Sequence, residues 1–391
     1  MSGPLEGVRV LDLGTRIGAP FCAGLLGEQG AEVIKVEQPG TGDFMRTIGP
    51  FVDGYSLFWA VEGRGRKGIT LDLRTPDGQE LFRRLSTHAH VICENFRPGT
   101  LEKWHIGPGD IDADDRLVWV RISVFGQDGP YSQRPGLDRL GIGYGGLLHL
   151  TGYPDRPPVR PGVTVSDYLT GVFAAQAATA LLYAGRGGVV DAPLYGSVLR
   201  ILEWTIAGQD RLGVTRTREG NRLKNSAPLD NYPTKDGKWV CVVAGSDANF
   251  ERLCHAMERT DLLTDPEWDT LAKRASRSDE INGIVADWTS TLTAHEVEQR
   301  CIEHDVPVGT AYTAQDIVDD PHMQQRHDIV TVDDPVIGPT MQQAPYPRID
   351  GEAPRAPAGA PTLGQHNDEV WCDLVGLTPD ELAGYRDRGV I

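Results

Sequence analysis

The sequence predicts an α/β protein with a mainly parallel sheet that has helices on both faces. Short, nearly continuous apolar runs alternate with helix-like segments through the first half of the chain, which is typical of strands buried on both faces. Gly and Pro residues separate these segments, as expected for the turns of such a fold. The chain has 391 residues, of which 40% are hydrophobic. That length and composition allow two domains, each with its own core.

The expected strands are short and apolar, and helix-like segments follow most of them. The strands are expected at residues 7–14, 31–39, 68–73, 89–96, 117–126 and 187–196. Helices are expected after Asp167 and at residues 18–30, 75–85 and 197–208. Ligands of parallel sheets bind beyond the carboxyl ends of the strands. The candidate binding segments are therefore residues 13–17, 37–40, 71–74 and 95–99.

The chain is expected to form a large domain and a smaller one. Residues 1–210 are the first part of the large domain, and a polar stretch at 210–232 marks its end. Residues 225–325 read as one strand followed by helices, which indicates a small α+β domain. Residues 326–391 are expected to be a linker and a C-terminal return to the large domain. The Pro-rich part of this segment, 335–361, is expected to run extended.

The formal net charge of −17 is unfavourable for a nucleic-acid-binding protein, which would present a basic face. It is also unfavourable for docking to an anionic membrane, although a local basic cluster would still suit a phosphorylated ligand. No run of about 18 apolar residues predicts a membrane span, and the N-terminus does not read as a secretory signal. The six cysteines have neither CxxC nor zinc-site spacing, so no metal site is expected. We therefore expect a cytoplasmic protein.

Asp167 is the only charged residue in an Ala-rich stretch that runs from Val163 to Ala184. Apolar residues such as Phe173 and Ala177 recur there with helical spacing. An Asp at the start of such a helix is most commonly an N-cap, whose oxygen accepts a hydrogen bond from a first-turn N–H group. It can also be a nucleophilic carboxylate that the helix holds rigidly. The stretch alone leaves both roles open.

Basic residues lie at the expected ligand edge of the sheet. Residues 95–99 (Asn-Phe-Arg-Pro-Gly) end a strand and are expected to open a helix, with Pro98 in its first turn. A helix N-terminus beside an Arg is a natural anion site, and an ordinary surface Arg is the alternative. Arg16 and Arg74 lie in other loops at the same edge. Together these residues indicate a polyphosphorylated ligand.

Residues 141–146 (Gly-Ile-Gly-Tyr-Gly-Gly) match the glycine pattern of dinucleotide-binding loops. The match does not lie between the first strand and the first helix, where such a loop belongs. With 46 glycines in the chain, a chance match is expected. We interpret this segment as a site of close backbone packing or as a flexible ligand loop.

Several motifs follow one another along nearly the whole chain. They are GVRVLDLG, GAEVIKVEQPGTGD with Arg46 shortly after it, ITLDLRTPDGQELFRRL, ENFRPGTLEKWHIG, SVFGQDGPYSQRPGLD, DYLTG, VPVGTAYTAQDIVDDP and LGQHNDEV. Together they resemble the family III CoA-transferases, which include formyl-CoA transferase, carnitine CoA-transferase and the alpha-methylacyl-CoA racemases. The resemblance implies a Rossmann-like large domain with a parallel sheet built from N- and C-terminal parts of the chain. It also implies an interlocked homodimer.

Asp167 matches the catalytic Asp of this family. The resemblance implies an acyl-CoA:carboxylate CoA-transferase in which Asp167 attacks the thioester and forms covalent aspartyl intermediates. Coenzyme A and acyl-CoA would be substrates, and no cofactor would be tightly bound. The implied CoA contacts are Arg16, Ile17, Leu71, Asp72, Leu73, Arg74, Asn95, Phe96, Arg97 and Lys103, with Asp138 as an acid near the reacting centre.

Two departures from the family narrow the expected activity. The racemases have a His before the acid that matches Asp138, whereas this chain has Leu137. Racemisation needs a base and an acid on opposite faces of the α-carbon, so transfer is favoured. The Gly-rich loop of the formyl-CoA enzymes is absent, so oxalate and formate are not expected as substrates. The alternatives are an acyl-CoA racemase or epimerase that uses Asp167, and a non-catalytic acyl-CoA-binding protein.

Overall fold

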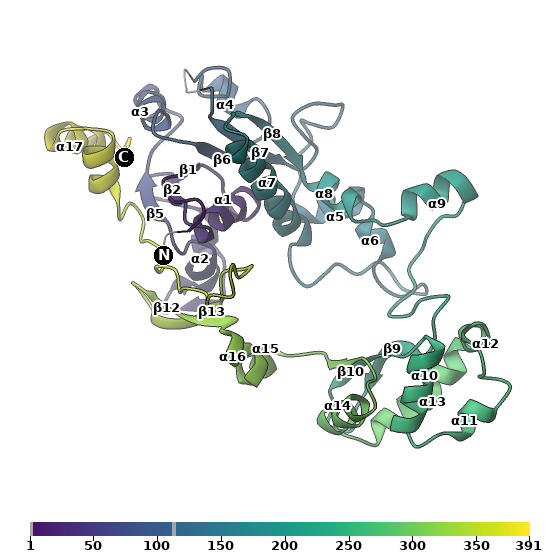
Figure 1. Cartoon of the computed structure of the whole chain (residues 1–391). Coiled ribbons are helices and arrows are strands. Elements are labelled where there is room, and N and C mark those ends of the chain that lie inside the picture. Colours follow the sequence, from purple (N-terminus) through teal and green to yellow (C-terminus); the bar gives the residue numbers. More distant parts are fainter. Residues whose placement is uncertain (1–2, 112–114) are drawn as a thin grey trace. The chain divides into compact units, whose positions relative to one another are not determined.

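A computed structural model describes residues 3–111 and 115–391 (Figure 1). The chain forms two compact units. Unit 1 contains the stretch that ends at Leu148 together with Pro161–Ile206 and Pro321–Ile391. Unit 2 contains His149–Arg160 and Ala207–Asp320. The chain therefore leaves unit 1 and returns to it twice.

Unit 1 is built on a six-stranded parallel sheet with the order β5-β2-β1-β6-β7-β8. Its strands are β1 (Arg9–Asp12), β2 (Glu32–Glu37), β5 (Lys67–Thr70), β6 (Val91–Glu94), β7 (Val118–Ser123) and β8 (Gly188–Pro193). The expected parallel α/β sheet is thus confirmed. The expectation that C-terminal residues add strands to it was wrong, because every strand precedes residue 194. The strand order reverses between β1 and β6, which is where doubly wound sheets bind ligands.

Alternate residues of the strands belong to two cores, one on each face of the sheet. Val10 packs in the core formed with helices α1 (Gly18–Glu28) and α7 (Val165–Tyr183). Leu11 packs in the opposite core, which helix α3 (Pro76–Ser86) and C-terminal residues complete. The C-terminal segment therefore joins unit 1 by packing on the sheet rather than by extending it.

The remaining elements of the stretches that make up unit 1 are short. The hairpins are β3 (Phe51–Val52) with β4 (Tyr55–Ser56) and β12 (Ile329–Asp334) with β13 (Gly338–Gln343). The helices are η1 (Phe44–Thr47), α2 (Leu57–Glu62), α4 (Thr100–Lys103), α5 (Asp138–Tyr144), α8 (Leu194–Arg200), α16 (Pro321–Arg326), η2 (Glu369–Leu374) and α17 (Pro379–Asp387). Helices α6 (Leu147–Leu150) and α9 (Thr205–Leu212) span the points where the chain changes unit.

Unit 2 pairs a small antiparallel sheet with helices. The sheet has the order β11-β10-β9, formed by β11 (Val308–Thr310), β10 (Trp239–Val243) and β9 (Leu229–Pro233). The helices are α10 (Asp247–Ala256), α11 (Asp261–Thr264), α12 (Leu271–Ser276), α13 (Ser278–Ser290), α14 (Ala294–Glu303) and α15 (Ala314–Asp319). Its core gathers apolar residues of β10, α10 and α13.

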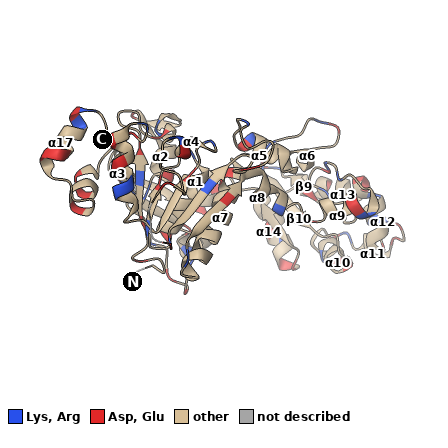
Figure 2. Ribbon diagram, turned by 90° about the horizontal axis from the view of Figure 1, so that it is seen from above, with Lys and Arg blue, Asp and Glu red and all other residues tan. Residues whose placement is uncertain are grey.

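Acidic and basic residues are interspersed along the ribbons of both units (Figure 2). Within residues 3–111 and 115–391, no helix is both long and apolar enough to cross a membrane. The same residues contain no group of three or more His, Cys, Asp and Glu side chains placed to hold a metal ion.

The structure differs from the sequence-based expectations at three local points. The helix expected to open at Pro98 begins at Thr100, because Gly99 is its N-cap with φ 84°, a conformation that glycine adopts readily. The helix expected at 197–208 is divided into α8 and α9. The Pro-rich tract at 335–361, expected to run extended, contains the strand β13, which pairs with β12.

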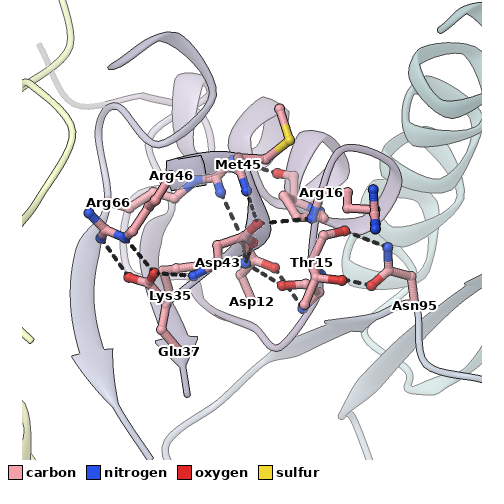
Figure 3. Close-up of polar contacts among 12 residues, drawn as sticks. Asp12, Thr15, Arg16, Lys35, Glu37, Asp43, Met45, Arg46, Arg66 and Asn95 are labelled. Carbon is pink, nitrogen blue, oxygen red and sulfur yellow. Dashed lines mark hydrogen bonds and ion pairs between the residues drawn. The ribbon is translucent and has the colours of Figure 1, made fainter. Parts of the chain in front are cut away.

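Four charged side chains are buried together beneath the connection between β1 and α1 (Figure 3). We call Asp12, Lys35, Asp43 and Arg66 the ion cluster. The Lys35 Nζ lies 3.4 Å from Asp12 Oδ2 and 3.0 Å from Asp43 Oδ2, and Arg66 Nη1 lies 2.9 Å from Asp12 Oδ2. Burial lowers the pKa of Lys35, but the charges of Asp12 and Asp43 raise it by more. Lys35 is therefore cationic, and each buried charge has a partner.

The ion cluster also binds the main chain of the β1–α1 connection. Lys35 donates a hydrogen bond to the Gly14 carbonyl, and Arg66 Nη2 donates one to the Pro20 carbonyl at 2.6 Å. Asp43 Oδ1 accepts the N–H of Arg16 at 3.1 Å. These bonds fix the path of the chain from β1 into α1, at the point where the sheet order reverses.

We expect Lys35→Met to lower the free energy of unfolding by about 3–5 kcal/mol, because it leaves the buried Asp43 carboxylate without its ion pair. Lys67→Met is the matched control. Lys67 pairs with Glu32 and Glu369 but remains about one-third exposed, so its loss should cost about 1 kcal/mol or less. Urea unfolding followed by circular dichroism measures both changes. Equal losses in the two variants would contradict a structural role for the ion cluster.

Candidate active site

Asp167 is the third residue of α7, which begins at Val165. The N-cap of the helix is Thr164, and no side chain makes a capping hydrogen bond there. Of the two roles that the sequence left open for Asp167, the structure therefore excludes that of N-cap. The helix was expected to begin after Asp167 but begins at Val165, so the Asp167 carboxylate lies within the first turn and is not a cap.

The Asp167 carboxylate lies against the first residue of α1. A Cβ atom at Gly18 would be 3.3 Å from Asp167 Oδ1 and 3.1 Å from Ile122 Cγ2 on β7. Glycine at position 18 thus gives the carboxylate room beside the helix. The first N–H groups of an α-helix have no partner within the helix, so the start of α1 presents free main-chain donors close to this carboxylate.

A second carboxylate, Asp138, holds the start of α7. Asp138 is the first residue of α5 and is only 8% exposed. Its Oδ1 accepts hydrogen bonds from Ser166 N at 2.9 Å and from Ser166 Oγ at 2.7 Å. Asp138 therefore fixes the residue that immediately precedes Asp167, and its negative charge stands close to the Asp167 carboxylate.

The pKa of Asp167 is raised from its ordinary value of 3.8 to about 7. Burial is the main cause, and the charge of Asp138 adds to it, while the charge of Arg16 acts in the opposite direction. Near neutral pH both the acid and the carboxylate form of this side chain are populated, as is common for reactive groups.

A pair of hydrogen bonds joins the two loops at the point where the sheet order reverses (Figure 3). Asn95, which follows β6, accepts the Thr15 N–H at 2.8 Å through Oδ1 and donates to the Thr15 carbonyl at 2.7 Å through Nδ2. The Asn95 amide is thus bound to the main chain rather than directed at a ligand. Asn95 shapes the loop that carries Arg16 and Ile17.

The other residues with an implied CoA role differ in what they can offer a ligand. Leu71 and Leu73 are buried in the core of unit 1, so only their main chain is available. Arg74 binds Asp72 through two hydrogen bonds of 2.8 Å, and this lowers the pKa of Asp72 to about 2. The remaining members are Ile17, which is buried, Phe96, whose ring packs edge-on against Trp104, and the exposed cations Arg97 and Lys103.

A cavity of about 610 Å³ lies at the carboxyl ends of β6 and β7. Asn95, Phe96 and Arg97 form one wall. Arg134 and Arg139, which the sequence reading did not single out, lie on the other. The volume suits a small-molecule ligand. The signal in the sequence was the segment SVFGQDGPYSQRPGLD, which contains Arg134 and is followed directly by Arg139 in α5.

The glycines at 141–146 serve packing, as one of the two interpretations predicted. Gly141 and Gly145 lie in and just after α5 rather than in a loop between a strand and a helix. A Cβ at Gly145 would lie 2.5 Å from the Cβ of Val198 on α8, so only glycine allows this approach. The segment is therefore not a dinucleotide-binding loop.

The sequence profile of CoA-transferase family III matches residues 5–367, most of the chain. This protein belongs to CoA-transferase family III. Succinyl-CoA–D-citramalate CoA-transferase of Chloroflexus aurantiacus is 43% identical over 394 residues, which cover 99% of this chain and 98% of the relative. Succinyl-CoA:glutarate CoA-transferase of Homo sapiens is 30% identical, with 99% and 90% covered.

A solved structure shows the same fold for this family III enzyme. The crystal structure of a CAIB/BAIF family protein from Brucella suis superposes with a TM-score of 0.86 at 28% identity, over 96% of this chain and 100% of the other. The resemblance inferred from the motifs is thus confirmed by the family profile, by full-length relatives and by the fold.

The raised pKa of Asp167 predicts how stability depends on pH. Because the folded protein disfavours the charged form, wild-type stability that is present below about pH 4 should be lost progressively as the pH rises to about 7. Asp167→Asn has no such ionisation. The unfolding temperature of Asp167→Asn, measured by calorimetry, should therefore rise relative to that of the wild type between pH 5 and pH 7. Above pH 7 the difference should stay constant.

Asp287→Asn on α13 is the control, since Asp287 is exposed and lies in unit 2. Its difference from the wild type should not change with pH. A constant difference for Asp167→Asn over the same range would show that its pKa is not raised.

Proposed function

We propose that this family III enzyme transfers CoA between an acyl-CoA and a free carboxylic acid, with Asp167 as the covalent nucleophile. One observation carries the proposal: a carboxylate with a pKa of about 7 lies against the start of α1, at the reversal point of a doubly wound sheet. No polar side chain within residues 3–111 and 115–391 makes a hydrogen bond to it, so it is available for attack.

The chemistry consists of four acyl transfers at one side chain. An Asp167 oxygen attacks the thioester carbonyl carbon, and the C–S bond breaks to give a mixed anhydride and CoA thiolate. The thiolate attacks the Asp167 carbonyl of that anhydride, which releases the first acid and leaves an aspartyl-CoA thioester. The acceptor carboxylate attacks the aspartyl carbonyl carbon of this thioester, and the C–S bond breaks to give a second mixed anhydride and CoA thiolate. The thiolate then attacks the acceptor's carbonyl carbon, which forms the new acyl-CoA and releases the Asp167 carboxylate. No water enters, so the energy of the thioester is conserved.

The residues around Asp167 have complementary parts in this scheme. The free N–H groups at the start of α1 stabilise the oxyanion that forms at each attack. Asp138 orients the first turn of α7 through Ser166 and keeps the pKa of Asp167 high. The CoA contacts are assigned to the loop at Arg16 and Ile17, to residues 71–74 and 95–97, and to Lys103.

The substrate class follows from the relatives. Their names specify succinyl-CoA together with citramalate, malate, mesaconate or glutarate. We assign this enzyme a short dicarboxylic acyl group on at least one side of the exchange. CoA is a substrate in this scheme, and no tightly bound cofactor is required.

We further propose an interlocked homodimer. Helix α7 is apolar on nearly all sides, a pattern that normally means burial, yet Tyr183 at its end is 94% exposed. Leu199, Ile201 and Trp204, on and after α8, are each at least 43% exposed. A second chain that covers this apolar surface accounts for it. The two departures of the chain from unit 1 suit an interlocked arrangement.

The cysteines support a reducing compartment, and we place the enzyme in the cytoplasm. All six cysteines are free, and four of them are buried. Cys22 and Cys93 lie with their sulfur atoms 3.9 Å apart without forming a disulfide. Unpaired thiols of this kind are typical of proteins that stay in a reducing environment.

The covalent role is tested with Asp167→Ala. We expect the variant to lose detectable exchange, by roughly 10⁴-fold or more because the nucleophile is removed, while CoA binding is retained within about threefold. Hydroxylamine added during turnover should convert Asp167 of the wild type to a hydroxamate, which peptide mass spectrometry identifies. Asp287→Ala should behave as the wild type. Substantial exchange by Asp167→Ala would refute the role of this residue.

The same assignment predicts a pH dependence. The nucleophile is the carboxylate, so kcat/KM for the acyl-CoA should rise with pH and level off above about pH 7. Asp138→Asn preserves an oxygen acceptor for Ser166 but removes the neighbouring charge. The kcat/KM of Asp138→Asn should therefore rise at a lower pH than that of the wild type. Identical profiles for the two proteins would show that Asp138 does not influence the ionisation.

A further inference from the structure

The backbone of Arg16 adopts an uncommon conformation that its surroundings enforce. Its φ angle is +66°, in the left-handed region that residues other than Gly, Asn and Asp seldom occupy. Asp43 Oδ1 accepts the Arg16 N–H at 3.1 Å, and Asn95 binds both the N–H and the carbonyl group of the preceding residue, Thr15. A strained residue held by several bonds is typical of functional positions. The surroundings therefore fix the main-chain conformation from which the Arg16 side chain extends.

The Arg16 guanidinium is exposed and has neither an ion pair nor a hydrogen bond to any residue that the structure describes. It stacks on the Phe44 ring, with its central carbon 3.8 Å from the ring centroid. Stacking occupies the face of the guanidinium and leaves the N–H groups along its edge available for a planar carboxylate. By contrast, the nearby Arg46 binds Glu37 and Arg66 binds Asp12.

The charges around Asp167 indicate which ligand group the Arg16 guanidinium would bind. Two carboxylates, Asp167 and Asp138, lie close together there. Arg16 is the one cation, among the residues described, whose charge registers at Asp167. An acyl group that ends in a second carboxylate would be repelled by Asp138 and by ionised Asp167 unless a cation received it. Arg16 is close enough to Asp167 to act electrostatically and has free donors to offer.

We propose that Arg16 is the specificity-determining residue that binds the second carboxylate of a dicarboxylic acyl group while its thioester carbonyl lies at Asp167. The inference rests on the proposed CoA transfer and names the recognition element of that same site. It assigns the guanidinium to the acid, whereas the main chain of the same loop remains beside CoA. Asn95 and Asp43 are positioning residues, because they hold the main chain of the loop rather than the ligand.

The test measures hydroxamate formation at Asp167 with two acyl-CoA donors of equal chain length. Succinyl-CoA carries the second carboxylate, and butyryl-CoA replaces it with a methyl group. The rate of labelling at low donor concentration gives a relative kcat/KM for the first covalent step. We expect the wild type to prefer succinyl-CoA and Arg16→Gln to lose roughly 10- to 100-fold with succinyl-CoA, but less than about threefold with butyryl-CoA.

Further variants separate recognition from other roles of the same side chain. Arg16→Lys should recover part of the loss with succinyl-CoA, because it keeps a cation. Asn95→Ala, which releases Thr15, should reduce labelling by succinyl-CoA more than by butyryl-CoA. The control is Arg277→Gln, since Arg277 in unit 2 also stacks on an aromatic ring, Trp268, and should leave both rates unchanged.

Each alternative outcome is decisive. Equal losses with both donors would mean that Arg16 binds CoA or adjusts the ionisation of Asp167, and would overturn the inference. A wild type that prefers butyryl-CoA would overturn it as well. A wild type that is labelled by no acyl-CoA would instead refute the covalent transfer itself, so the two failures are distinguishable.

Discussion

The pairing of buried charges beneath the β1–α1 connection is the constraint on which the site depends. Four ionised side chains are removed from water there, and such burial is tolerable only when every charge meets its partner. That requirement fixes β2, the loop before η1 and the start of α1 relative to one another. The loop that carries Arg16 then has one path, and Asp43 holds it to that path. The buried charges thus order the surface loop that we assign to substrate binding.

The site balances opposed electrostatic effects rather than maximising one of them. Burial and Asp138 disfavour the charged form of Asp167, while Arg16 favours it. A carboxylate held fully ionised by strong hydrogen-bond donors would be a poor nucleophile. One held fully protonated could not attack a thioester. The intermediate pKa suits the role that we propose for Asp167, which is to be nucleophile and leaving group in turn.

The sequence predicted the parallel sheet well, because strands that are buried on both faces consist of nearly continuous apolar residues. The apolar patterns misjudged the start of α7, since Val165 and Ser166 carry no signal that separates helix from turn. The candidate nucleophile came from resemblance, as an Asp at a helix start is usually a cap. The roles of Asn95 and Asp43 depend on contacts with Thr15 and Arg16, which are distant along the chain. Arg134 and Arg139 were missed for the same reason.

The Asn95 side chain makes both of its hydrogen bonds with Thr15 to main-chain atoms of Thr15. Every amino acid other than proline supplies the same N–H and C=O groups at that position. Replacements of Thr15 by residues other than proline therefore leave both hydrogen bonds to Asn95 in place. The course of the loop beside α1 is thus set by main-chain contacts, separately from the acid recognition that we propose for the side chain of Arg16.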